Sequence, residues 1–496
     1  MEILLDPKSV DSYRMFTSIK RLPSYTIRGR VAEFPDEYAS IVGVSAPSIP
    51  SSDYESPAWM FDYQRAITER AVRAQKYAVF ADCGLGKTPI LLEFARHAAE
   101  NIRDGRRILI VSPLMVVSQT VQEAAKFYGD YPIDTVKASD LDQWVKGKCG
   151  KNRIGITNYD AITDKLSRGV LDGIILDESS MLKSHYGKWG TKIIELGKGC
   201  KWKLCLTGTP APNDRIEYAN HAVFLDQFST VNAFLATYFV NRGQTDNRWE
   251  LKPHALNPFY RSLSHWSIFV TNPATYGWKD NTETIPPIRV HVHSVPMTDQ
   301  QKRIMQYETG QLFANSSGGI VGRSLAGQLG KGFHRGCRVE TNKPAFIRDL
   351  ISQWKDRTST IIWCLYNEEQ KLLEEFMPDA ASITGTTPPA KRQKLIDAFK
   401  RGEITELISK PKILGFGLNL QVATKHVFSG LQDSYESYYQ CIKRSNRYGS
   451  TEPLDVHIPV TDVEEPMIQT VLRKADRVQK DTEAQERMFA ISQSCQ

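Results

Sequence analysis

The chain repeats one pattern: a short run of apolar residues, a turn, and then a segment with helical periodicity. In its first half the apolar runs are KYAVF, RILIV, GIIL and KLCL, and the helical segments include PILLEFARHAAE and VVSQTVQEAAKF. Fully apolar strands are typical of parallel sheets that are covered by helices on both faces. The alternation therefore predicts an α/β fold with parallel sheets flanked by helices.

A second series of the same kind begins near Thr360, with the runs STIIWC, ASITG, TELIS, KHVF and DVHIPV. The chain has 496 residues, which is too long for one ordinary hydrophobic core. The two series together predict two α/β lobes.

The segments outside these series set the expected domain boundaries. Residues 1–55 form a small N-terminal accessory region and a linker, because the stretch APSIPSSDYESP is rich in Pro and Ser. Residues 214–298 are aromatic and too long for a simple connector, so we expect a helical insertion and interlobe linker there. The first lobe then covers residues 56–213 and the second covers 299–461. A charged amphipathic helix over residues 462–496 is expected to brace the lobes.

The composition excludes several classes of protein. Hydrophobic residues make up 41% of the chain and charged residues 24%, which is typical of a globular protein. The sequence has no signal-peptide pattern and no apolar stretch near the ~20 residues that span a bilayer, so we expect a soluble intracellular protein. The eight cysteines lack the paired spacing of a zinc site, and the net charge of +7 suits a polyanionic partner.

The segment ADCGLGKT follows the first apolar run directly. Gly84 and Gly86 would keep the backbone open, and a helix that begins at Lys87 would aim its N–H groups at a phosphate. Lys87 would reach the β- and γ-phosphates of a nucleotide, and the hydroxyl of Thr88 would ligate Mg²⁺. Because Ala81 stands where the usual loop has its first glycine, a chance glycine-rich turn is the competing interpretation.

Two other apolar runs end in polar residues that suit the same chemistry. Asp177 and Glu178 follow the run GIIL, where Asp177 would hold Mg²⁺ and Glu178 would orient and deprotonate the attacking water. Thr207 and Thr209 follow the run KLCL, and their hydroxyls could relay the state of the γ-phosphate. Each pair also fits an ordinary polar turn after a buried strand.

Arg444 and Arg447 lie three residues apart in the segment YYQCIKRSNRYGS. We expect them to share one face of a helix. Two guanidinium groups presented together match the charge on a phosphoryl group in flight. A basic helix on a solvated surface is the alternative interpretation.

These segments follow one another in the order of a known motif series, and the chain resembles the superfamily-two helicases, specifically the Swi/Snf-like ATP-dependent DNA translocases. The resemblance extends from about Phe61 to about Ile468, and a chance occurrence of the whole ordered series is negligible. Family members carry a DEMGLGKT-like loop, so the loop at Lys87 favours nucleotide binding despite Ala81. The matching segments are FDYQ, GLGKT, ILIVSPLMVVSQ, ITNYD, DESS, LTGTPAPN, MTDQQ, STIIWCLYNEEQ, ITGTTPPAKRQKLIDAF, GFGLNLQ and QCIKRSNRYG.

The resemblance implies two RecA-like lobes with ATP and Mg²⁺ in the cleft between them, completed by Arg444 and Arg447 from the second lobe. It assigns Gln64 to the adenine base. It places the phosphates at Gly84, Gly86, Lys87 and Thr88. It suggests contacts with the DNA strand at or beside Ser112, Lys183, Thr386 and Asn419. It assigns the coupling of hydrolysis to movement to Thr207, Thr209, Gly417 and Gln440.

The chain departs from the family pattern at three places. Motif II is DESS rather than DEAH or DEGH, which puts the coupling role of Ser180 in question, and Ser450 replaces the usual glutamine. Thr271 and Asn272 stand where paired arginines are common. The large insertions of chromatin remodellers are absent, which favours a compact bacterial or phage enzyme.

Such an enzyme would act on duplex or forked DNA in the cytoplasm of a bacterial cell, a host cell if it is phage-encoded. Replication or recombination proteins are its expected partners, and no membrane is involved. The alternatives are a nucleotide-gated DNA-binding scaffold or loader that hydrolyses ATP poorly, and an RNA helicase. The intact Lys87, Asp177 and Glu178 favour the motor.

Overall fold

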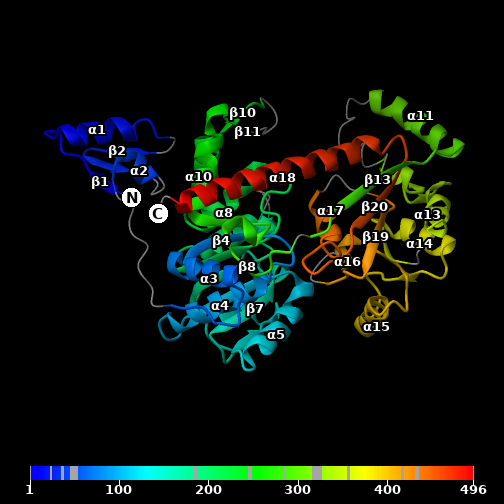
Figure 1. Cartoon of the computed structure of the whole chain (residues 1–496), viewed down its shortest axis with the longest axis horizontal. Coiled ribbons are helices and arrows are strands. Elements are labelled where there is room, and N and C mark those ends of the chain that lie inside the picture. Colours follow the sequence, from blue (N-terminus) through cyan, green and yellow to red (C-terminus); the bar gives the residue numbers. More distant parts are fainter. Residues whose placement is uncertain are drawn as a thin grey trace. The chain divides into compact units, whose positions relative to one another are not determined.

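We analysed a computed structural model of the chain. It divides into two compact units, residues 1–282 with 479–496, and residues 283–478 (Figure 1). The structure describes residues 2–22, 25–34, 38–44, 54–182, 188–243, 249–283, 285–314, 325, 327–354, 358–414, 418–430 and 435–494.

The N-terminal residues form a small module with its own core. Three short strands pair antiparallel in the order β1-β3-β2. Ile19, Ala32, Phe34 and Tyr38 are buried in its core. The elements are β1 (Glu2–Leu4), α1 (Val10–Ile19), β2 (Thr26–Arg28), β3 (Val31–Glu33) and α2 (Ala39–Val42).

The main body of the first unit contains a seven-stranded sheet in which every neighbouring pair of strands is parallel. The strand order is β12-β4-β9-β8-β5-β7-β6. This confirms the predicted parallel sheet of the first lobe. The strands are β4 (Lys76–Ala81), β5 (Arg107–Ser112), β6 (Ile133–Thr135), β7 (Ile154–Asn158), β8 (Leu171–Asp177), β9 (Trp202–Leu206) and β12 (Ser267–Val270).

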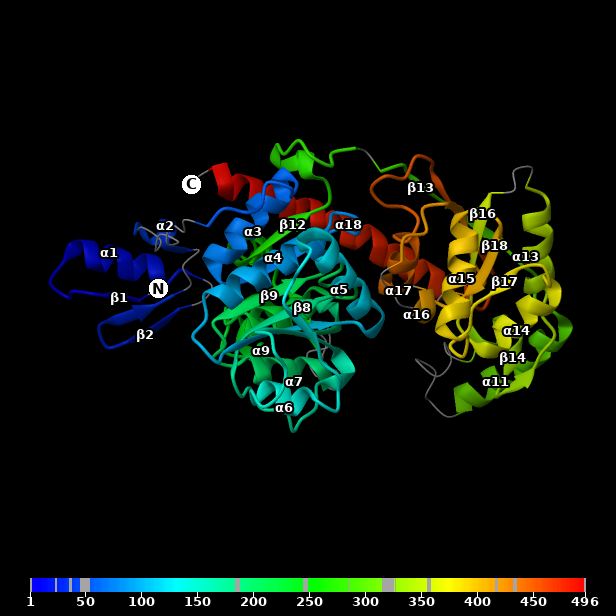
Figure 2. The same cartoon turned by 90° about the horizontal axis from the view of Figure 1, so that it is seen from below.

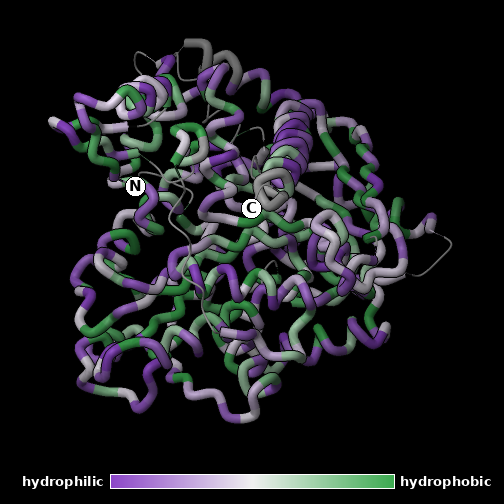
Figure 3. The backbone as a smooth tube through the Cα atoms, turned by 60° about the vertical axis from the view of Figure 1, so that its left-hand side comes forward, coloured by the Kyte–Doolittle hydropathy of each residue, from purple (hydrophilic) through white to green (hydrophobic). Residues whose placement is uncertain are grey.

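Two hydrophobic clusters cover the two faces of this sheet, as the apolar strand runs require. One cluster takes in α3, α4 and α5, and the other takes in α6, α7 and the helices that follow β9 (Figure 2). Figure 3 shows that hydrophobic and hydrophilic stretches alternate along the backbone. The helices are α3 (Asp62–Ala74), α4 (Lys87–Glu100), α5 (Leu114–Tyr128), α6 (Leu141–Val145) and α7 (Lys188–Gly197).

The segment after β9 contains helices, as expected, but it also supplies strands. Its helices are α8 (Tyr218–Phe224), α9 (Val231–Tyr238) and α10 (Leu256–Trp266), and β10 (Phe239–Asn241) pairs with β11 (Trp249–Leu251). The four residues that follow α10 form β12, which pairs with β4 at the edge of the sheet. The run SIFV is fully buried, and β-branched and aromatic residues favour a strand there.

The second unit contains a six-stranded parallel sheet in the order β13-β20-β19-β16-β18-β17, which confirms the second α/β lobe. Its strands are β13 (Ile288–Ser294), β16 (Ser359–Trp363), β17 (Ala381–Ser382), β18 (Glu406–Ser409), β19 (Ala423–Phe428) and β20 (Leu454–Val460). The strands β14 (Phe333–His334) and β15 (Cys337–Arg338) form a separate hairpin. The helices are α11 (Asp299–Ala314), α13 (Lys343–Ser352), α14 (Asn367–Phe376), α15 (Pro389–Lys400), α16 (Pro411–Leu414) and α17 (Tyr435–Ile442).

The last helix, α18 (Glu465–Ser494), belongs to both units. Its first part buries Met467, Ile468 and Val471 in the second unit. Its last part belongs to the first unit, where Asp481 accepts two hydrogen bonds from the guanidinium of Arg215, at 2.5 and 2.9 Å. Within the described residues no helix is long and apolar enough to cross a membrane.

Candidate functional site: a nucleotide-binding edge of the first sheet

The predicted residues of the first lobe gather where four parallel strands end. β4 ends at Ala81, β5 at Ser112, β8 at Asp177 and β9 at Leu206. The register pairs Asp177 with Leu206, and the amide of Thr207 donates to the carbonyl of Val79. Ligands of open parallel sheets bind at this carboxyl edge. The structure thus brings the phosphate loop, the acidic pair and the two threonines to one edge.

The phosphate loop joins β4 to α4 through glycines in the left-handed region. Gly84 has a φ of 94° and Gly86 a φ of 64°. A Cβ on Gly86 would collide with Nε2 of Gln64, so the site requires glycine for space as well as conformation. α4 begins at Lys87, whose Nζ donates to the carbonyl of Ala81 at 2.9 Å. A bound phosphate would compete with that carbonyl for the ammonium group.

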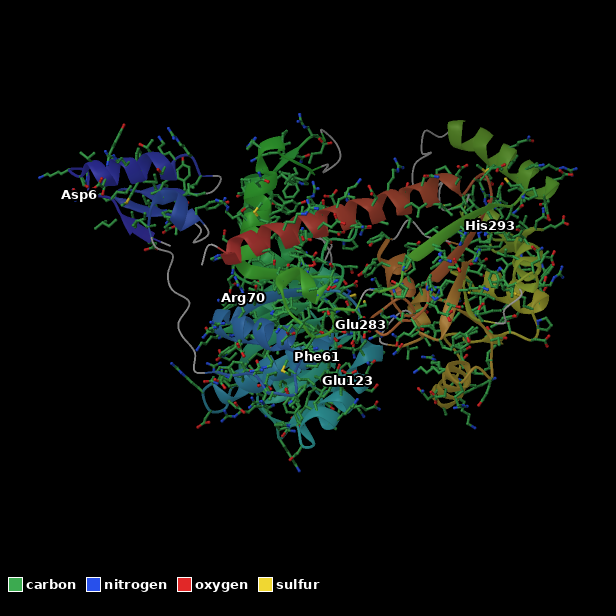
Figure 4. All side chains as sticks on the ribbon, viewed as in Figure 1. Asp6, Phe61, Arg70, Glu123, Glu283 and His293 are labelled. Carbon is green, nitrogen blue, oxygen red and sulfur yellow. The ribbon has the colours of Figure 1, made fainter. Side chains whose placement is uncertain are left out.

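Gln64 is tied directly to the phosphate loop. Its Nε2 donates to the carbonyls of Leu85 at 3.2 Å and Gly86 at 3.3 Å, and its Oε1 accepts from the amide of Phe61 at 3.1 Å. Phe61 caps the start of α3 and is labelled in Figure 4. The glutamine predicted to contact adenine is therefore hydrogen-bonded to the phosphate loop in the structure.

Asp177 ends β8 in a buried acidic environment. Burial and the neighbouring Glu178 raise its pKa to about 6, while the Ser112 hydroxyl and the charge of Lys87 oppose that rise. The Ser112 hydroxyl donates to Oδ2 of Asp177 at 2.8 Å, and the Tyr159 hydroxyl donates to its carbonyl at 2.7 Å. A bound cation would relieve the cost of holding this carboxylate charged.

Ser112 was predicted to lie at the DNA strand. Its side chain is fully buried and is engaged with Asp177, so only the neighbouring backbone is left for a strand contact. Its hydroxyl orients a carboxylate of the acidic pair.

Glu178 has a left-handed backbone with a φ of 52°, which is rare and costly for a residue with a side chain. The Thr207 hydroxyl donates to its Oε2 at 3.2 Å and accepts from the amide of Thr209 at 3.1 Å. Thr207 is fully buried and Thr209 nearly so. Such local strain clusters at functional sites, and here it accompanies a side chain that Thr207 holds in place.

The two serines of DESS are both buried. Ser179 lies within hydrogen-bond distance of Nε2 of His221, at 3.0 Å, and burial lowers the pKa of that histidine to about 4. A neutral histidine on α8 thus contacts the serine that follows the acidic pair. The sequence assigned no role to His221 or Tyr159, because each acts through a contact between distant segments.

Arg444 and Arg447 do not share a helical face, contrary to the sequence prediction. α17 ends at Ile442, and the following residues form turns. Gly449 has a φ of 84°, and the Ser450 hydroxyl accepts from the amide of Arg447 and donates to the carbonyl of Ser445. Side-chain hydrogen bonds of this kind compete with helix continuation.

Arg444 is 5% exposed, and within the described part of the chain its Nε has no hydrogen-bond partner. A buried guanidinium nitrogen without a partner costs free energy that an anionic ligand could recover. Arg447 is half-buried in the turn that follows.

The other candidates in the second unit are spread over several elements. Gln440 is buried in α17, whereas Thr386 and Asn419 are exposed. The Asn419 amide donates to Oε1 of Gln421 at 2.8 Å. Lys183 and Gly417 lie outside the described residues.

The residues around Asp177 fit a magnesium ion bound together with a nucleotide. Among the residues that the structure describes, no three His, Cys, Asp or Glu side chains cluster as a protein-only metal site would require. Mg²⁺ at phosphates typically uses one or two protein oxygens and keeps its waters. Asp177 and the half-buried hydroxyl of Thr88 are such oxygens.

Comparison with known families shows to which family the chain belongs. Residues 63–330 match the SNF2-related domain, and residues 342–449 match the helicase conserved C-terminal domain. The chain belongs to the SNF2-related family. As a member it is an ATP-hydrolysing, helicase-type DNA translocase, which confirms the predicted resemblance and enzyme class.

Two individual proteins are similar to this SNF2-related chain. The putative protein p41 of Acyrthosiphon pisum secondary endosymbiont phage 1 is 24% identical over 432 residues, which cover 80% of this chain and 91% of p41. The solved structure of the Sulfolobus solfataricus SWI2/SNF2 ATPase core in complex with dsDNA is 19% identical with a TM-score of 0.41. That match covers 88% of this chain and 96% of the Sulfolobus chain.

Proposed function

We propose that this protein moves along duplex DNA by hydrolysing ATP at the carboxyl edge of its first sheet, in replication, recombination or repair. The observation that carries the proposal is the acidic pair. Asp177 ends β8 and Glu178 follows it. Ser112 at the end of β5 and Thr207 just after β9 hold the two carboxylates, and the Lys87 charge acts on Asp177. Two neighbouring carboxylates with different hydrogen-bond partners can take different tasks, one at the metal ion and one at the attacking water. Such a pair suits hydrolysis rather than passive binding.

In the proposed mechanism the loop amides and Lys87 bind the phosphates, and Thr88 and Asp177 hold the metal ion. Mg²⁺, when bound, neutralises charge on the phosphates. Gln64 contacts the base. Glu178 accepts a hydrogen bond from the attacking water and takes its proton as the water oxygen bonds to the γ-phosphorus. The bond between the γ-phosphorus and the oxygen that bridges it to the β-phosphorus breaks in the same step, and ADP leaves with that oxygen. The Thr207 hydroxyl fixes the other carboxylate oxygen, which keeps Glu178 aimed at the water.

We assign to Arg444 and Arg447 the stabilisation of the charge on the transferred phosphoryl group. The buried Nε of Arg444, which has no partner among the residues that the structure describes, supports an anionic ligand at this turn. We further propose that Gln440 and Gly417 couple this turn to movement. Asn419, Thr386, Lys183 and the backbone beside Ser112 would contact the phosphates of the DNA, whose binding would then weaken steeply with salt.

The net charge of +7 and the family support DNA as the partner. The likeness to the phage protein p41 supports a phage or bacterial enzyme that works in the cytoplasm of a bacterial cell. Replication or recombination proteins are the proposed protein partners.

The proposal is tested by measuring ATP turnover with single-stranded, duplex and forked DNA and with RNA, for the wild-type protein and for Glu178→Gln. We expect duplex DNA to stimulate the wild-type rate strongly and RNA to have little effect. Glu178→Gln should bind ATP and stay slow with every ligand. Turnover that no nucleic acid stimulates would contradict the motor, and stimulation by RNA alone would indicate an RNA helicase.

A further inference from the structure

The segment that leads from the first unit toward the second is fastened to the nucleotide site. The first unit ends, in this part of the chain, at Thr282. Just before that point, the amides of Lys279 and Asp280 donate to the Asp62 carboxylate, at 2.7 and 3.3 Å. In return the amide of Asp62 donates to Oδ2 of Asp280 at 2.8 Å. Each aspartate therefore satisfies backbone groups of the other segment.

One residue further on, Asn281 reaches the buried Tyr63. Its Nδ2 donates to the Tyr63 hydroxyl at 3.0 Å, and that hydroxyl donates to the carbonyl of Leu85 in the phosphate loop at 2.8 Å. Asn281 has a left-handed φ of 57° and is only 9% exposed. Asparagine tolerates this conformation better than most residues, and the loop contact explains why the chain adopts it.

The Tyr63 hydroxyl has one hydrogen to give, and it gives it to the loop. Gln64 is the second side chain on the same loop, through Leu85 and Gly86. A glutamine that recognises adenine donates from its amide to N7 and accepts from the 6-amino group. To do so, Gln64 must withdraw at least one donor hydrogen from the loop carbonyls.

We propose that Tyr63 and Asn281 are positioning residues for ATP: when adenine engages Gln64, the hydroxyl that Asn281 orients becomes the remaining side-chain anchor of the phosphate loop. Asn281, at the start of the interlobe linker, thus affects the affinity for ATP more than the affinity for a nucleotide with another base. This proposal rests on the proposed function for the role of Gln64 alone. It goes beyond that function because it makes linker residues determinants of base selectivity.

The sign of the effect follows from counting anchors. Without nucleotide, Tyr63 and Gln64 are the described side chains outside the loop that donate to its carbonyls, and Gln64 also donates to the Tyr63 hydroxyl. With adenine bound, mainly Tyr63 still holds the loop. Removing the Tyr63 hydroxyl therefore weakens the ATP-bound state more than the free state. Guanine offers a carbonyl where adenine has its amine, so it does not recruit Gln64 in the same way. The affinity for GTP should therefore depend less on the Tyr63 hydroxyl than the affinity for ATP does.

The experiment measures nucleotide affinity directly, without DNA, by displacing a fluorescent ATP analogue with ATP or GTP. Tyr63→Phe keeps the ring and loses the hydroxyl, and Asn281→Gly keeps the left-handed backbone and loses the donor. Each should raise the Kd for ATP about fivefold, the value of one ordinary hydrogen bond, and change the Kd for GTP less than about twofold. The double variant should be no worse than Tyr63→Phe, because both act through one hydroxyl.

Lys279→Ala is the matched linker control. It removes an exposed side chain and keeps the main-chain bond to Asp62, so both affinities should be unchanged. Equal losses for ATP and GTP, or a lower Tm with both affinities intact, would show a merely structural role and overturn the proposal. Additive losses in the double variant would overturn the part played by Asn281.

These results are separable from the proposed function. A wild-type protein that binds ATP but shows no DNA-stimulated turnover would sink the motor while leaving this test in place. A wild-type protein that binds no nucleotide would overturn both.

Discussion

Replacing Thr207 with valine tests whether the geometry of Glu178 sets the rate of hydrolysis. The two side chains have nearly the same shape, but valine cannot donate to Oε2 of Glu178. A hydrogen bond to a charged group contributes about 1.5–3 kcal/mol, and the 3.2 Å distance favours the lower end. A loss of about 1.5 kcal/mol in the transition state corresponds to about a tenfold lower kcat.

The same change has a second, structural effect. The amide of Thr209 loses its acceptor, which costs about 1–3 kcal/mol of folding free energy because the group is buried. Turnover is therefore measured well below the Tm of the variant, with saturating ATP and DNA. The Kd for ATP is measured alongside and should stay within about twofold, since Thr207 touches the carboxylate that acts on water.

Two variants serve as controls. Thr207→Ser keeps the hydroxyl and should restore most of the rate. Thr209→Val makes the same chemical change two residues away but keeps the main-chain bond to Thr207, so it should leave Glu178 in place. Wild-type kcat in Thr207→Val, or equal losses in all three variants, would refute the role assigned to the Thr207 hydroxyl.

Three further outcomes follow from the structure. Glu178→Gln should lower kcat by at least about 100-fold with an unchanged Kd for ATP, because an amide cannot take the proton of water; an equal loss of binding would reassign the residue. Arg447→Ala should lower kcat with little change in DNA affinity, whereas a pure affinity loss would make it a strand contact. Glu464 is buried between Lys331 and Lys343. Although its burial opposes ionisation, the two lysines lower its pKa to about 2. The stability that the charged Glu464 contributes is present above its ordinary pKa of about 4.5 and is lost as pH falls toward 2. Urea unfolding at pH 7 should therefore show Glu464→Gln to be about 3–5 kcal/mol less stable than the wild-type protein. The difference in unfolding free energy between the two proteins should shrink as the pH is lowered.

The sequence predicted the two sheets because buried parallel strands have nearly continuous apolar runs. It predicted that the phosphate loop and the acidic pair lie together, because the carboxyl ends of the parallel strands β4 and β8 lie at one edge of the sheet irrespective of the loop conformations. β12 was missed since its four-residue run lies inside an aromatic segment, where burial rather than periodicity decides. A strand this short has too few residues to show a pattern.

The contacts that tune the site were beyond the sequence. Ser112, Tyr159 and His221 come from segments far apart in the chain, and their roles depend on packing rather than on spacing. The turn at Arg444 was mistaken for helix because a spacing of three residues matches one face of a helix, while local hydrogen bonds of Ser450 close the turn instead.

The central claim is that hydrolysis at the acidic pair drives movement along duplex DNA, and displacement of a third strand from a triplex measures this most directly. We expect ATP-dependent release of the third strand with the underlying duplex intact, and no release by Glu178→Gln. Vigorous DNA-stimulated hydrolysis that leaves the triplex in place would contradict it.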